Sequence, residues 1–137
     1  MRLVITILCL WVCTLQCLQA QIPTKGIGAS ATEVLSAYGT PLTRESKEGG
    51  LSITYAFKTP YINGTLGIQY IIFGFNDDQQ VKSWMVVEDL SEANRWVKIL
   101  NANYVKLSPN FWQDYTTDSI IKTSTEKGKF FIFCYKE

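Results

Sequence analysis

LGIQYIIFGF, the stretch Leu66–Phe75, decides the fold that we expect for this chain. It is followed by a polar turn, NDDQQ (Asn76–Gln80), and by a second apolar run, VKSWMVV (Val81–Val87). Two runs of β-branched and aromatic residues joined by a short polar segment are typical of a β-hairpin. The first run has apolar side chains on both of its faces, which favours a central strand covered on both sides. The rest of the chain is expected to cover or extend this hairpin.

Two segments have the pattern of amphipathic helices. Ser30-Ala31-Thr32-Glu33 fits a capping box, apolar residues recur on one face as far as Tyr38, and Gly39 is placed to end the helix. A second helix is expected to begin near Asp89–Glu92 and to extend to Asn103, because its apolar residues recur at spacings of three and four.

Further strands are expected at Leu51–Phe57, Phe111–Tyr115, Ser119–Ser124 and Phe130–Tyr135. The segment Leu42–Gly50 is polar and mixed in charge, and no strand is expected there. The order is therefore helix, three strands, helix, three strands. This order predicts an α+β fold with two layers, in which the helices pack on an antiparallel sheet. The halves 30–88 and 89–137 would form a tandem helix-plus-three-strand pseudo-repeat, a hypothesis that comes from the layout alone.

The N-terminus has the features of a secretory signal peptide. Arg2 is followed by an apolar run from Leu3 to Leu15 and by a small residue, Ala20, at the expected cleavage point. The run is shorter than the roughly 20 residues of a transmembrane helix. We therefore expect a signal peptide over 1–20 and a single exported domain over 21–137, located in the periplasm, associated with the cell envelope, or secreted. Cys17 offers an alternative, in which cleavage before this residue and lipid attachment to it produce a lipoprotein tethered to a membrane.

Charge and cysteine content exclude several classes of protein. Removal of Arg2 with the signal peptide leaves 12 basic and 12 acidic residues, with no basic stripe for nucleic acid. Cys134 is the only cysteine after residue 20, so the domain has no internal disulfide. We expect Cys134 to be buried as a small hydrophobic residue, with an intermolecular disulfide as the alternative.

The chain contains no histidine, which excludes Ser-His-Asp and Cys-His catalysis. It also lacks a Walker loop, a dinucleotide fingerprint and EF-hand spacing, so we expect a non-enzymatic protein with no cofactor and no metal. A carboxylate-dependent hydrolase that uses Asp114 and Asp118 is the least favoured reading.

Aromatic residues near predicted loops are the candidates for binding. Exposed aromatic rings in such places hold peptides or sugars, whereas packing of the same rings in the core or at its rim is the favoured alternative. Asn63 begins a glycosylation sequon for a eukaryotic host, and Ser119 lies in a motif similar to a bacterial O-glycosylation acceptor. The binding candidates are Tyr61, Phe111, Trp112 and Tyr115.

Residues 26–88 resemble the SmpA/OmlA (BamE-like) family of small envelope lipoproteins. The similarity rests on the Gly26 and Gly28 lead, the short helix closing in Gly39-Thr40-Pro41, and the aromatic strands that end at Phe73–Asn76. The wider layout of two helix-plus-sheet units is similar to the β-lactamase inhibitor protein (BLIP-like) class. The resemblance implies a binding or scaffold role in the bacterial cell envelope, with a protein partner that it does not identify. The alternative is a secreted inhibitor that blocks an enzyme through loops such as Lys58–Thr65.

Overall fold

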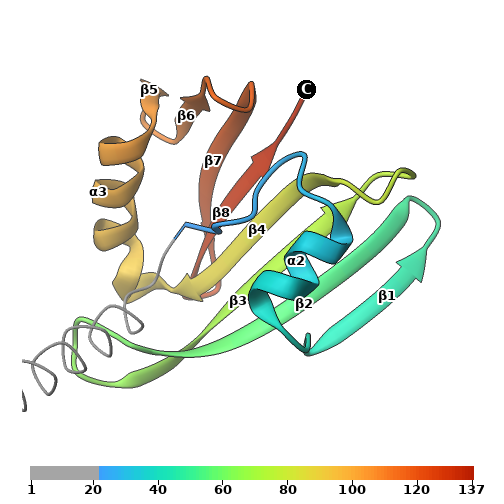
Figure 1. Cartoon of the computed structure of the whole chain (residues 1–137). Helices are drawn as coiled ribbons and strands as arrows, with labels where there is room; N and C mark the ends of the chain where they lie inside the picture. Colours follow the sequence, from blue (N-terminus) through green and yellow to red (C-terminus); the bar gives the residue numbers. More distant parts are fainter. Residues whose placement is uncertain (1–21) are drawn as a thin grey trace, which may run out of the picture.

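The computed structural model describes residues 22–137, in which eight strands form one antiparallel sheet (Figure 1). The strand order across the sheet is β1-β2-β3-β4-β8-β7-β6-β5. Two helices, α2 (Ala31–Tyr38) and α3 (Ala93–Asn103), and a 3-10 turn, η1 (Leu90–Glu92), complete the described elements. The strands are β1 (Thr43–Lys47), β2 (Gly50–Pro60), β3 (Leu66–Phe75), β4 (Val81–Asp89), β5 (Val105–Ser108), β6 (Phe111–Asp114), β7 (Ser119–Glu126) and β8 (Lys129–Tyr135).

The predicted two-layer α+β class is wrong, because strands dominate the molecule and the helices do not form a full second layer. Strands hold 52% of the described residues and helices only 19%, so the molecule is an antiparallel sheet that carries two short helices. The helix-plus-three-strand pseudo-repeat is also wrong, because β1–β4 and β5–β8 give four strands to each half.

The two strands that the sequence did not reveal are β1 and β5, at opposite edges of the sheet. Every side chain of both strands is exposed. An edge strand with no buried face has no apolar alternation, which is the signal that identifies strands in a sequence. The polar segment Leu42–Gly50 therefore has no strand signal, although Thr43–Lys47 within it pair with β2.

The hairpin predicted from Leu66–Phe75 and Val81–Val87 is confirmed as β3 and β4. Tyr70 pairs with Val87 and Phe73 pairs with Trp84, with an irregularity between Gly74 and Phe75. β4 also pairs with β8 over seven residues, and this contact joins the two halves of the chain into one sheet.

The first helix forms as its capping residues predict. The Glu33 amide donates to Ser30 Oγ at 3.1 Å, and the Ser30 amide donates to Glu33 Oε2 at 2.8 Å. Gly39 ends the helix with a φ of 78°, a conformation that glycine adopts without steric cost. The second helix begins after Asp89, whose carboxylate accepts from the Ser91 amide, and it ends at Asn103 as expected.

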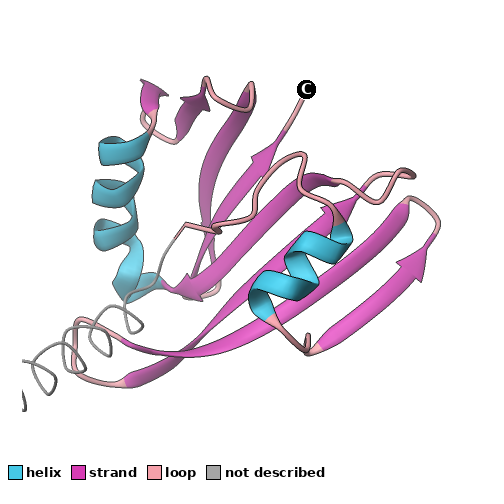
Figure 2. Ribbon diagram, in the orientation of Figure 1, coloured by secondary structure: helices cyan, strands magenta, loops and turns pink. Residues whose placement is uncertain are grey.

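Both helices pack on the same face of the sheet, which we call the inner face. Figure 2 shows α2 in front of the half of the sheet that β1–β4 form, and α3 beside the half that β5–β8 form. Val34 of α2 and Trp96 and Leu100 of α3 are fully buried in the core that they form with this face. The lead before α2 adds to the cover, since the Gly28 amide donates to the Val81 carbonyl at 2.9 Å. The inner face is therefore the hydrophobic core of the protein.

Candidate protein-binding face

The other side of the sheet, the outer face, is also apolar. Successive side chains of a strand point to opposite faces, so buried Ile71 and Phe73 place Tyr70 and Ile72 on the outer face. The pairing then fixes two rows across the three central strands. These rows are Tyr70–Val87–Phe131 and Ile72–Met85–Phe133.

A third row, Ser83–Tyr135–Ile120, extends the apolar area to β7. Side chains directly opposite each other in paired strands lie about 4.5–5.5 Å apart at Cβ, so the members of each row are neighbours. Diagonal neighbours in adjacent rows lie about 7–8 Å apart, which is within reach of aromatic and long side chains, so the three rows form one continuous area. We call this group the open-face patch. It consists of Tyr70, Ile72, Met85, Val87, Ile120, Phe131, Phe133 and Tyr135.

No helix or strand of residues 22–137 covers the open-face patch, because both helices and the lead lie on the inner face. Tyr70 is 37% exposed, and Ile68, next to it on the outer face of β3, is 47% exposed. The other patch residues are half-buried against one another. The prediction that Leu66–Phe75 is covered on both sides is therefore wrong. The apolar residues on its second face form an uncovered surface.

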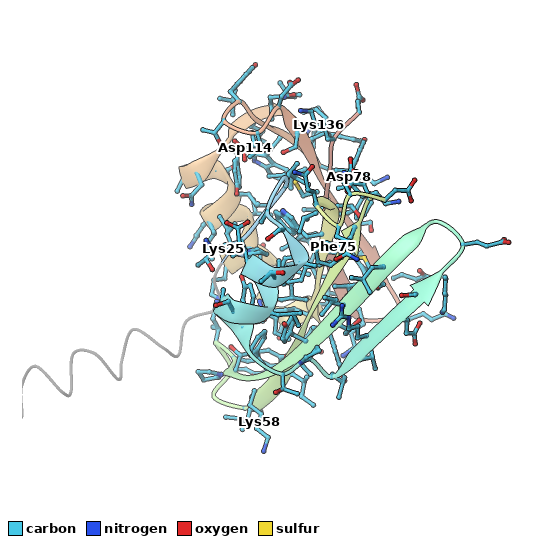
Figure 3. All side chains as sticks on the ribbon, turned by 45° about the vertical axis from the view of Figure 1, so that its right-hand side comes forward. Lys25, Lys58, Phe75, Asp78, Asp114 and Lys136 are labelled. Atoms are coloured by element: carbon cyan, nitrogen blue, oxygen red, sulfur yellow. The ribbon has the colours of Figure 1, made fainter. Side chains whose placement is uncertain are left out.

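The four aromatic binding candidates do not come together. Lys58, near Tyr61 in the chain, and Asp114, next to Tyr115, lie at opposite ends of the molecule in Figure 3. The ring of Tyr61 packs over Gly67, and its hydroxyl donates to the Ile68 carbonyl at 3.3 Å.

The remaining candidates differ in exposure. Trp112 is fully buried, and its Nε1 donates to Asn101 Oδ1 at 2.9 Å, so its ring belongs to the core. Tyr115 is 69% exposed in the loop after β6. Phe111 is 41% exposed and pairs with Lys122, which places it on the outer face beside the open-face patch.

A buried polar cluster lies on the inner face below the start of α3. Arg95 donates to Glu92 at 2.5 Å and to Glu88 at 3.2 Å, and the Trp96 indole also donates to Glu88. Glu92 in turn accepts from the Ile62 amide at 2.8 Å, which ties the β2–β3 loop to the helix. Burial raises the pKa of Glu88 despite the donors from Trp96 and Arg95. These contacts connect β4, the β2–β3 loop and the start of α3, so the cluster holds these three elements together.

Asp114 and Asp118, the carboxylates considered for hydrolysis, lie in one turn. Burial raises the pKa of Asp114, but hydrogen bonds from Thr116 and Thr117 outweigh it and hold the pKa below its usual value. Both oxygens of Asp114 accept from these threonines at 2.6–2.9 Å. Asp114 therefore stabilises the turn between β6 and β7 through these hydrogen bonds. The described residues include no cluster of three or more histidine, cysteine, aspartate or glutamate side chains arranged for a metal ion.

The predicted burial of Cys134 is confirmed. Burial raises the pKa of its thiol to about 11, and the thiol donates to Ser119 Oγ at 3.4 Å. Ser119 itself is fully buried, so a sugar cannot be attached to it in the folded protein. Asn63 is exposed in the β2–β3 turn, where its side chain accepts from Thr65.

Two predictions concern the N-terminus. The signal peptide and the lipidation alternative at Cys17 lie outside the described residues. Among residues 22–137, neither helix has the length and apolar character needed to cross a bilayer.

No protein-family model, curated protein or solved structure matches this chain. The resemblance to the SmpA/OmlA family and to the BLIP-like class therefore stays a prediction. Function has to be inferred from the open-face patch and its surroundings.

The signal for this face was present in the sequence. Segments 66–75, 81–87 and 130–135 have apolar residues at both odd and even positions. For Leu66–Phe75 this pattern predicts cover on both sides, but one core face and one apolar surface face produce the same pattern.

Proposed function

We propose that this protein is an exported, non-enzymatic binding module that holds a protein partner on the outer face of its sheet. The observation that supports this proposal is the open-face patch, which spans β3, β4, β8 and β7 without cover from any described element. Contiguous apolar surface of this kind is uncommon on monomeric soluble proteins and marks sites of interaction. The compartment that we propose, the bacterial cell envelope, follows from the resemblance stated above.

The composition of the patch supports a protein partner. Its aromatic and methionine side chains, Tyr70, Phe131, Phe133, Tyr135 and Met85, are the types enriched at protein interfaces. The rings of Phe133 and Tyr135 stack with their centroids 5.3 Å apart, which gives the patch a rigid centre. A rigid aromatic surface loses little conformational entropy on binding.

The test is site-specific photo-crosslinking in the cells that produce the protein. A photoreactive amino acid replaces Ile72 or Phe133 on the outer face, and the matched control replaces Thr32, which is exposed on α2 on the other side of the sheet. We expect a crosslinked protein of one defined mass from both outer positions and none from Thr32. The proposal fails if neither outer position gives a product, or if Thr32 gives the same product.

A further inference from the structure

Lys122 of β7 is a charged side chain that lies on the outer face against the open-face patch. Its cross-strand neighbours are Phe133 on β8 and Phe111 on β6. The ammonium group lies 5.4 Å from the ring of Phe133 and 5.6 Å from the ring of Tyr135. Ile120 and Ser124 flank it on its own strand, so apolar side chains and one hydroxyl surround the charge.

Lys122 has no carboxylate partner in the part of the chain that the structure describes. The ion pairs found there join Lys47 to Glu45 and Arg95 to the two buried glutamates. Its ammonium is exposed to water and rests on two aromatic rings. Water therefore satisfies its charge in the free protein.

A partner that covered the patch would remove this water. Burial of an ammonium without a counter-ion is strongly unfavourable, and the cation–π contacts with the two rings offset only part of that cost. A wholly apolar partner surface would therefore be rejected at Lys122. A carboxylate at the same point would pair with the ammonium and set the register of the complex.

We propose that the partner segment carries an aspartate or glutamate side chain set among apolar residues, and that this carboxylate pairs with Lys122. This inference rests on the proposed function, because it requires that a protein partner occupies the outer face. The inference adds that a carboxylate on the partner is required for recognition. The aromatic rings supply contact area and Lys122 supplies the charge preference.

The test is selection from a random library of displayed 12-residue peptides with the purified protein as bait. We expect the wild type to enrich peptides with an acidic residue flanked by apolar ones. Lys122→Glu should enrich Lys or Arg at that point, and it should weaken binding of the acidic peptides about tenfold or more. Lys98→Glu, a charge reversal at an exposed position of α3, should leave the selection unchanged.

Two further results separate this inference from the proposed function. Val87→Asp, in the open-face patch, should abolish recovery of the peptides while the variant still unfolds cooperatively. If recovery depends on Val87 but the enriched sequences do not change with Lys122→Glu, the charge inference is overturned and the binding face stands. If no peptide is enriched, or recovery does not depend on Val87, the proposed function fails and this inference fails with it.

Discussion

Ile71 and Ile72 are adjacent residues of β3 that point to opposite faces of the sheet, and they allow the two faces to be compared directly. Ile71 is 3% exposed in the core below α2 and α3, whereas Ile72 lies half-buried between Thr54 and Met85 on the outer face. The same substitution, isoleucine to alanine, removes the same atoms from each face. Strand propensity and chain position are matched.

The expected cost differs because only one site leaves a cavity. Ile71→Ala loses the transfer free energy of a fully buried side chain and opens a hole in the core, which together cost about 3 kcal/mol. Ile72→Ala removes area that already contacts water and leaves no closed cavity, so we expect about 1 kcal/mol. The difference is a large fraction of the 5–15 kcal/mol that typically stabilises a domain.

The assay is urea unfolding followed by tryptophan fluorescence, for which buried Trp84, Trp96 and Trp112 are suitable reporters. Affinity for the crosslinked partner or for a selected peptide should show the opposite order. Ile72→Ala should bind more weakly, whereas Ile71→Ala, where it is folded, should bind as the wild type does. Equal losses of stability near 3 kcal/mol would contradict an outer face that is open to solvent. That result would mean that something covers the outer face in the native protein.

Three further predictions concern the inner face and the first helix. Ser30→Ala should lower the free energy of unfolding by about 1 kcal/mol in urea titrations, because the Glu33 amide loses its capping oxygen, and an unchanged midpoint would contradict the capping role. Glu88 has a folded-state pKa above its ordinary value of 4.5, so its contribution to stability falls as pH rises from 4.5 through the folded-state pKa. In plots of the free energy of unfolding against pH between 4 and 8, Glu88→Gln should remove this part of the slope. Parallel plots for the wild type and the variant would contradict the burial of the carboxyl group. Cys134 should resist a thiol-reactive dye at pH 8 in the native protein and react once urea unfolds it, whereas fast native labelling would show an exposed thiol.

Local signals in the sequence predicted the elements that carry them. The capping box at Ser30, the glycine at position 39 and the turn at Asn76–Gln80 each specify backbone geometry through a few neighbouring residues. Those elements formed where they were expected. β1 and β5 have no such signal, because they are fixed by hydrogen bonds to β2 and β6 rather than by a buried face of their own.

The candidate site shows a different limit. Phe111 and Trp112 are adjacent aromatic residues near a proline, and the sequence gives no reason to separate them. In the structure, strand alternation sends Trp112 into the core and Phe111 to the outer face. The open-face patch is made by pairing of β3, β4 and β8, and β8 is separated from β4 by some forty residues of chain. A surface formed by such long-range pairing can be identified only once the register is known.

The proposed binding surface requires that the outer face of the sheet is apolar and open to solvent. We would test it by measuring the broadening of isoleucine methyl NMR signals by a soluble paramagnetic probe in the purified protein. We predict strong broadening for Ile68 and Ile72 and little for Ile53 and Ile71. If the Ile72 methyl were protected as well as that of Ile71, the face would be covered in the native protein, and the proposed binding surface would be contradicted.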